Sequence, residues 1–146
     1  MRVKEVISKC EDLLCVEYTR EDLLHCYNII EQDLALNYDP VYETHRCDAK
    51  VVYFTDFKYK PARIISCSGK FKIYPTYIES EENIKEVIYS YIPDAKKLND
   101  DSSYNSSALN CLVYGTIAEF MIMQGFYEEA MPWHNRYQQE IKMLMI

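Results

Sequence analysis

Histidine and cysteine stand close together twice in this 146-residue chain, as His25-Cys26 and as His45-Arg46-Cys47. These are the ligand types of a tetrahedral zinc site, and four of them would complete one. His25 and Cys26 fall within a helical pattern, however, where adjacent side chains point about a quarter-turn or more apart. The spacing therefore favours the simpler interpretation, with Cys26 in the core and His25 at the surface.

The other reactive side chains form no catalytic constellation. His134 lies beside Trp133 on a helical pattern without an evident partner, which favours a solvated histidine. Glu81-Glu82 and Glu128-Glu129 stand at expected turns and helix starts, where acids interact well with the helix dipole. The three glycines are far apart, so no loop of clustered backbone donors could bind phosphate. We therefore predict that the protein is not an enzyme and holds no cofactor and no metal.

Composition indicates a soluble globular protein. With 146 residues and 49% apolar side chains, the chain is expected to form one domain, residues 1–146. Its six cysteines include no CxxC pair, which favours reduced thiols used as small apolar side chains. Residues 1–5 do not resemble a signal peptide. The apolar run 111–123 contains Glu119 and is too short to span a bilayer, so we expect an intracellular protein with no membrane partner.

Charge is unevenly distributed along the chain. Residues 49–78 carry six basic residues and one acidic residue, net +5, whereas the whole chain carries −7 and the remainder therefore −12. An acidic chain is a poor non-specific ligand for nucleic acid, because that binding depends on basic groups. Segregated charge instead favours docking to complementary protein neighbours.

The basic segment is also rich in tyrosine, which leaves two interpretations. Aromatic faces stack on bases and lysines follow phosphates, so a nucleic-acid surface is one. Lys70 and Lys72 also alternate with Phe71 and Ile73, which is how an exposed strand protects its edge from pairing. We favour the edge interpretation because the rest of the chain is acidic.

The hydrophobic periods predict an α+β fold. Residues 2–38 have helical spacing, with Thr19 and Asp22 as the start of a second helix and Pro40 beyond its end. Residues 49–93 are rich in β-branched and aromatic residues and predict a small inserted antiparallel sheet of three to four strands, arranged as a meander. In this scheme residues 79–83 are a polar turn between strands.

Residues 105–146 predict an antiparallel helical hairpin. Apolar residues recur at helical spacing in each arm. They are Leu109, Leu112, Val113, Ile117, Phe120 and Met121 in the first, and Ala130, Trp133, Tyr137, Ile141 and Leu144 in the second. Gly125 would end the first helix. Pro132 either lies inside the second helix or begins it. Glu119 and Arg136 fall at similar heights on the two arms, so an ion pair is predicted between them.

The chain ends in four apolar residues, Met143, Leu144, Met145 and Ile146. Flexible methionine side chains in an exposed apolar patch are common where a partner docks. The same residues could equally close the protein's own core. Both interpretations stay open at this point.

Three segments carry a resemblance to a known family: Phe57-x-x-x-Pro61-x-Arg63-Ile64-Ile65, the strand Val87-Ile88-Tyr89-Ser90-Tyr91-Ile92-Pro93, and Ala118-Glu119…Gly125-x-x-Glu128-Glu129-Ala130-x-x-Trp133-x-x-Arg136-Tyr137. Together they resemble the head–tail adaptor (connector) proteins of tailed bacteriophages. The resemblance implies a structural virion protein of the neck, assembled in the host cytoplasm. It also implies a homo-oligomeric ring, commonly dodecameric, that binds the portal protein and a tail or neck protein and lets DNA pass without specific binding. Residues 143–146 fit a portal-gripping segment by position.

A monomeric protein-binding module or regulator is the alternative. Oligomeric state separates the two classes, because an adaptor must assemble and a monomeric regulator need not. An enzyme with an unrecognised site ranks below both.

Overall fold

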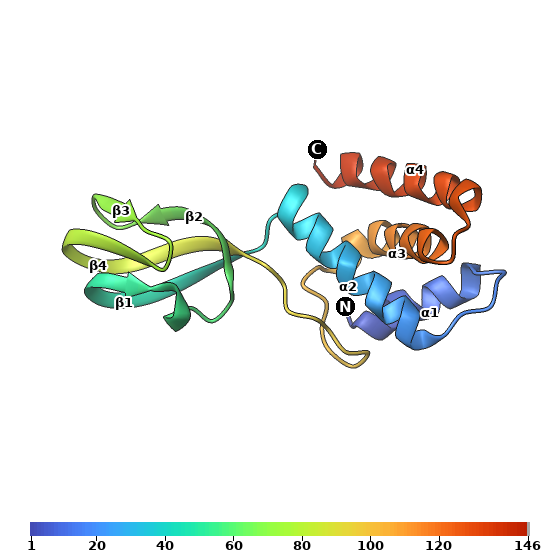
Figure 1. The fold of residues 1–146 in the computed structure, drawn as a ribbon, viewed down its shortest axis with the longest axis horizontal. Coiled ribbons are helices and arrows are strands. Elements are labelled where there is room, and N and C mark those ends of the chain that lie inside the picture. The colour runs from blue at the N-terminus through green and yellow to red at the C-terminus, as the bar shows by residue number, and fades with distance from the viewer. Residues whose placement is uncertain (146) are drawn as a thin grey trace. The chain divides into compact units, whose positions relative to one another are not determined.

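The computed structural model describes residues 1–145, and within them the chain forms four α-helices and a four-stranded antiparallel sheet (Figure 1). The predicted α+β class is confirmed. The helices are α1 (Val3–Leu13), α2 (Arg20–Asn37), α3 (Leu109–Met123) and α4 (Tyr127–Leu144). The strands are β1 (Tyr42–Tyr53), β2 (Pro61–Cys67), β3 (Phe71–Ile73) and β4 (Tyr77–Tyr91). The chain divides into two compact units. The helical unit comprises residues 1–34 and those from 95 onward, and the sheet unit comprises residues 35–94.

The central helix of the helical unit is α3. Its buried residues are Cys111, Leu112, Val113, Gly115, Thr116, Ile117, Ala118, Phe120 and Met121, which lie on nearly all sides of the helix. A helix that is apolar all round is one that other helices surround. The window Ser106–Met123 is therefore apolar enough by composition to cross a membrane, although 56% of it is buried inside the protein. The predicted apolar stripe is only part of the buried surface of α3. The spacing of apolar residues does not reveal how many other helices pack against a given helix.

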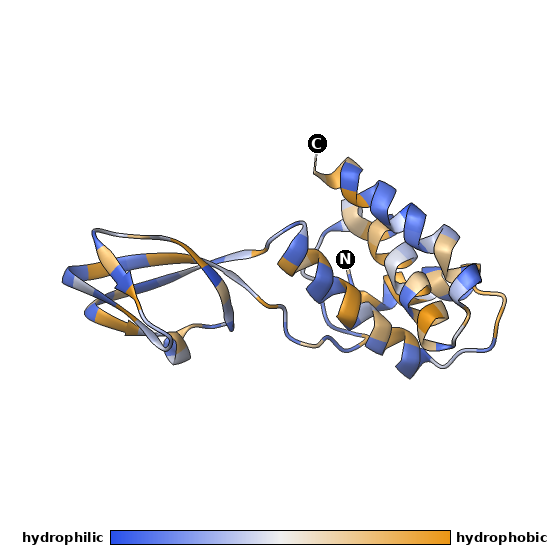
Figure 2. Cartoon of the chain, turned by 45° about the horizontal axis from the view of Figure 1, so that its top comes forward, coloured by the Kyte–Doolittle hydropathy of each residue, from blue (hydrophilic) through white to orange (hydrophobic). Residues whose placement is uncertain are grey.

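Gly115 lets two neighbours approach α3 closely. A Cβ atom built there would lie 2.7 Å from Ile30 Cγ2 on α2 and 2.8 Å from Tyr137 Cδ1 on α4. Real Cβ atoms do not sit at such distances. Figure 2, coloured by hydropathy, shows α4 with hydrophilic and hydrophobic residues in alternation, as expected for a helix that covers α3 on one side only.

The predicted helix ends at Thr19 and Gly125 are confirmed. Thr19 Oγ1 accepts a hydrogen bond from the Asp22 amide at 3.1 Å, which caps α2. Asn105 Oδ1 accepts from the Ser107 amide at 3.0 Å, just before the short 3-10 turn that leads into α3. Gly125 has φ +83°. The Phe126 amide donates to the Met121 carbonyl at 2.8 Å, so the glycine closes α3 as a Schellman motif.

The N-terminus is paired to the segment that precedes α3. The Val3 amide donates to the Asp100 carbonyl at 3.0 Å, and the Ser102 amide donates to the Met1 carbonyl at 2.9 Å. These backbone bonds run like a short antiparallel ladder. They attach the first residues of α1 to a segment that has no regular structure of its own.

The sheet departs from the predicted meander. β4 pairs with β1 along one side and with β2 and β3 along the other, so it is the central strand. The sheet also begins at Tyr42, seven residues before the predicted start at position 49. Prediction failed here because strand pairing is non-local: residues far apart in sequence supply the hydrogen bonds that make a polar segment a strand.

Residues 79–83 are not a turn but part of β4. Ala49 of β1 pairs with Ile84 and Val51 pairs with Glu79, so residues 80–83 lie opposite Lys50 alone and form a wide irregularity. The polar composition that predicted a turn therefore marks this bulge. The core of the sheet unit holds Val52, Phe57, Ile78, Ile84, Val87 and Tyr89. Stacked rings extend it, with centroids 4.4 Å apart for Phe57 and Tyr89 and 4.1 Å apart for Tyr59 and Tyr91.

Candidate protein–protein interface

Helix α4 is held to the helical unit along one side. Ala130, Tyr137 and Ile141 are buried against it, and Trp133 and Leu144 are half-buried, as the spacing predicted. The Tyr137 hydroxyl also donates to Asp33 Oδ2 on α2 at 2.9 Å. α4 begins at Tyr127, which decides between the two predicted positions of Pro132 in favour of one inside the helix.

Arg136 lies on the exposed side of α4 and stacks on aromatic rings. Its guanidinium carbon is 4.8 Å from the ring centroid of Trp133 and 5.9 Å from that of Tyr114. These distances are in the range of cation–π interactions. Trp, Tyr and Arg are also the residue types that most often carry the binding energy of protein interfaces. The cluster of Trp133 and Arg136 on α4 with Tyr114 on α3 is therefore a candidate site for binding a partner.

The predicted ion pair between Glu119 and Arg136 is wrong. No ion pair within 4.0 Å joins these two residues in the described part of the chain. Equal height on two arms does not determine which side of each helix a residue occupies, and Arg136 is directed to the rings instead. The charge of Glu119 instead affects a thiol on α2. Burial, together with the charges of Glu119 and Asp22, raises the pKa of the Cys26 thiol to about 12.

The end of α4 and the residue that follows it present apolar side chains to solvent. Met143 is 66% exposed and Met145 is 60% exposed, whereas Leu144 is half-buried and Ile146 lies outside the described residues. Successive helical residues are about 100° apart, so Met143 and Met145 project in widely different directions. A partner that covered both would have to enclose the end of the helix.

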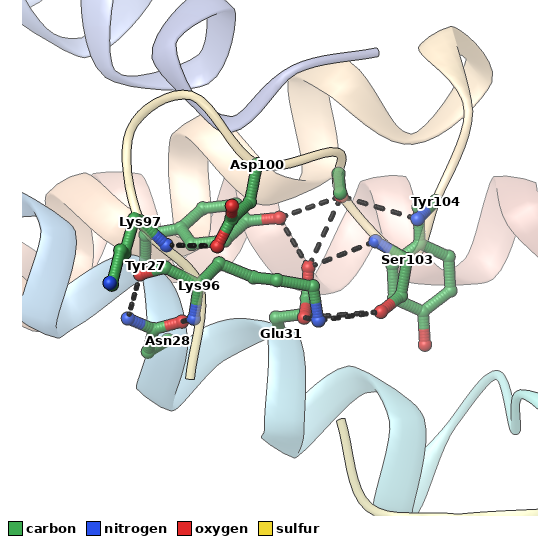
Figure 3. Close-up of polar contacts among 9 residues, drawn as sticks. Tyr27, Asn28, Glu31, Lys96, Lys97, Asp100, Ser103 and Tyr104 are labelled. Carbon is green, nitrogen blue, oxygen red and sulfur yellow. Dashed lines mark hydrogen bonds and ion pairs between the residues drawn. The ribbon is translucent and has the colours of Figure 1, made fainter. Parts of the chain in front are cut away.

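The most concentrated polar cluster of the helical unit surrounds Glu31 of α2, which is only 1% exposed (Figure 3). One carboxylate oxygen, Oε1, accepts from Lys96 Nζ at 2.9 Å and from Ser103 Oγ at 3.2 Å. The other, Oε2, accepts from the Tyr27 hydroxyl, and from Ser102 Oγ and the Ser103 amide at 3.2 Å each. A buried carboxylate is stable only when paired and hydrogen-bonded in this way.

This cluster holds a segment rather than a ligand. The five donors use the acceptor capacity of the carboxylate, which leaves no lone pair for a substrate or a metal ion. Asn28 adds two bonds to the backbone of Lys96, at 3.1 Å through its amide nitrogen and 2.7 Å through its oxygen. Together these contacts attach the irregular segment before α3 to α2.

Sequence reasoning missed this cluster, although one signal was present. Glu31 follows Tyr27 by four residues and precedes Leu34 by three, which puts a charged side chain on the apolar side of α2. A charge in that position requires a buried partner. Its partner, Lys96, lies 65 residues away in a polar segment that resembles an ordinary loop.

The histidines and cysteines take the simpler of the predicted arrangements. Among the described residues no group of three or more His, Cys, Asp or Glu side chains could hold a metal ion. Cys26 is buried and His25 is exposed, and the His45 ring packs on Phe57 with centroids 4.8 Å apart. All six cysteines are free thiols. Burial, together with the nearby charge of Glu11, raises the pKa of Cys10 to about 12, so this thiol stays protonated and unreactive.

A comparison with protein-family models finds no match to this chain, and a comparison with curated proteins finds none either. Among the described residues, the aromatic and cationic cluster of Tyr114, Trp133 and Arg136 is the candidate surface.

Proposed function

We propose that this protein is a structural head–tail adaptor subunit of a tailed bacteriophage, which forms a ring under the portal and extends the DNA channel to the tail. The observation that carries the proposal is that α4 carries the Trp133–Arg136 stack and ends in exposed methionines, Met143 in its last turn and Met145 directly after it. The resemblance of the hairpin motif to adaptor proteins supports it.

The proposal assigns the end of α4 to the portal. Exposed Met143 and Met145 supply flexible apolar contacts, and methionine adapts its shape to the partner's surface. Because the two side chains project in different directions, a portal socket that surrounds the helix end would bury both. The half-buried Leu144 would then keep the helix end attached to its own unit.

Portal binding tests the proposal directly. The double variant Met143→Ser/Met145→Ser should lose binding to the portal protein encoded in the same genome, measured by co-purification and by electron microscopy of the rings. Both side chains are exposed, so thermal unfolding followed by circular dichroism should be unchanged. Tyr42→Ser is a matched control, since it removes a side chain that is 56% exposed in the sheet unit.

Two outcomes would contradict the proposal. Undiminished portal binding by the double variant would remove the role of this helix end. A wild-type protein that neither binds portal nor assembles would favour the monomeric binding module, which could use the same exposed residues for a different partner.

A further inference from the structure

A stretch of the sheet unit from residue 58 to residue 73 is basic in sequence and is here called the basic run; its Lys72 lies opposite Glu79 of β4 in the sheet register. The basic run contains no acidic residue, and its five basic side chains are all exposed: Lys58, Lys60, Arg63, Lys70 and Lys72. None of them forms an ion pair within 4.0 Å among residues 1–145. Exposed apolar side chains lie in the same run, with Ile65 at 48%, Phe71 at 37% and Ile73 at 54%.

The helical unit carries a surface of the opposite sign at the connection between α3 and α4, here called the hairpin tip, residues 122–131. Its exposed large apolar side chains are Ile122, Met123, Phe126, Tyr127 and Met131. Glu128 and Glu129 are exposed between them, and the tip contains no basic residue. Neither glutamate forms an ion pair within 4.0 Å in the described residues.

The conformation of the hairpin tip is fixed by contacts within the chain. The Schellman bonds around Gly125 close α3, and buried Ala130 attaches the first turn of α4 to the unit. A rigid surface loses little conformational entropy on binding. The exposed apolar residues are therefore presented in one arrangement and not as a loose loop.

We propose that the basic run of one copy binds the hairpin tip of a second copy of this chain. Each surface combines unpaired charge with exposed apolar side chains, and the charges are opposite in sign. Binding would place Glu128 and Glu129 of the tip against basic side chains without breaking an ion pair inside either unit. The two surfaces differ, so the contact is head-to-tail: in a pair, one copy keeps its basic run free and the other keeps its hairpin tip free. Further copies can therefore add, and the array closes as a ring when the rotation between copies allows it. This inference rests on the proposed adaptor function and supplies its subunit contact.

A second copy fits the basic run better than nucleic acid does. The chain as a whole is acidic at −7, which opposes the approach of a polyphosphate. Nucleic acid also offers no apolar partner for exposed Ile65 and Ile73, whereas the hairpin tip does. Charge-reversed variants distinguish the two ligands, because a second copy and a nucleic acid would respond differently to them.

Two charge-reversed variants test the contact by sedimentation velocity at low salt. Lys70→Glu/Lys72→Glu should reduce self-association by about tenfold or more, and so should Glu128→Lys/Glu129→Lys, because each puts like charges together. An equal mixture of the two should assemble again, since the two glutamates introduced in one variant then face the two lysines introduced in the other, and the unchanged run and tip also face each other. The wild-type association should also weaken as salt increases.

The control variant is Lys4→Glu/Lys50→Glu, which changes the net charge by the same amount as Lys70→Glu/Lys72→Glu, at exposed residues outside both surfaces, and should still self-associate. The inference is overturned if the wild-type chain stays monomeric, if either reversed variant assembles like the wild type, or if the mixture does not recover. It is also overturned if reversal of Lys70 and Lys72 weakens only binding to a DNA duplex. Portal binding is measured separately, so its loss or retention decides the proposed function independently of this contact.

Discussion

Lys96 Nζ lies 2.9 Å from Glu31 Oε1, and the two residues come from parts of the chain 65 positions apart. The Glu31 side chain is 1% exposed and that of Lys96 is 17% exposed. Tyr27 and two serines complete the hydrogen bonds of the carboxylate. A charge this well enclosed is stable because its partners are in position, so the pair serves as an attachment between α2 and the segment before α3.

Removal of one partner should be costly. Lys96→Met leaves the Glu31 carboxylate buried without its counter-charge, and we expect a loss of about 3–5 kcal/mol in the free energy of unfolding. Urea denaturation measures this value. Lys97→Met is a matched control because that side chain is the same type, one residue further along, and exposed. A loss below about 1 kcal/mol for Lys96→Met would show that water reaches the carboxylate in solution.

Gly115→Ala should loosen the packing of α3. The new methyl group would lie within 3 Å of both Ile30 and Tyr137, so one of the neighbouring helices must shift. Overpacking of this kind costs about 1–3 kcal/mol. Asn110→Ala is the control, since it changes an exposed position on the same helix. If thermal unfolding shows Gly115→Ala to be as stable as the wild type, the helices are less closely packed than described.

Gly125→Ala should weaken the turn between α3 and α4. The residue has φ +83°, a conformation that costs an L-amino acid about 1–2 kcal/mol. Nothing lies within 4 Å of a Cβ atom at this position, so the backbone conformation alone produces the effect. Comparison with Gln124→Ala by urea denaturation separates it from a general effect of the site. An unchanged midpoint would argue against the Schellman closure.

Alkaline pH should destabilise the protein, because two buried thiols and a buried tyrosine hydroxyl resist ionisation in the folded state. Burial raises the pKa of Cys10 and of Cys26 to about 12 from an ordinary value of 9.0, and burial with the charge of Glu31 also raises that of Tyr27. Above pH 9.0 the unfolded chain loses these protons while the folded chain keeps them. The stabilisation is therefore complete below pH 9.0 and is lost as the pH rises towards about 12.

Urea denaturation midpoints measured between about pH 8 and 11 would show this loss of stability, because that range covers the start of thiol ionisation in the unfolded chain. The slope should be smaller in Cys10→Ala/Cys26→Ala, because two of the titrating groups are gone. Cys15→Ala is the control, since that thiol is exposed. A slope unaffected by the double substitution would mean that the two thiols ionise in the folded protein.

The elements that depend on neighbours in sequence were predictable. Thr19 and Gly125 act at helix ends through bonds that span three to five positions, so their chemistry can be read locally. The apolar spacing of α4 likewise identified its buried side. The α+β class followed from the change of period between the helical and the sheet segments.

The pairings between distant residues were decided only by the tertiary structure. β4 became the central strand because β1, β2 and β3 all supply hydrogen bonds to it, and those bonds make residues 79–83 a strand despite their polar composition. The ion pair of Glu31 with Lys96, and the contact of Arg136 with Trp133 rather than with Glu119, likewise depend on how distant segments pack. The sequence by itself determines what each side chain can bond to and how nearby residues are spaced. Which distant partner it reaches depends on how the helices rotate and the strands align as the whole core is buried, and no local pattern contains that information.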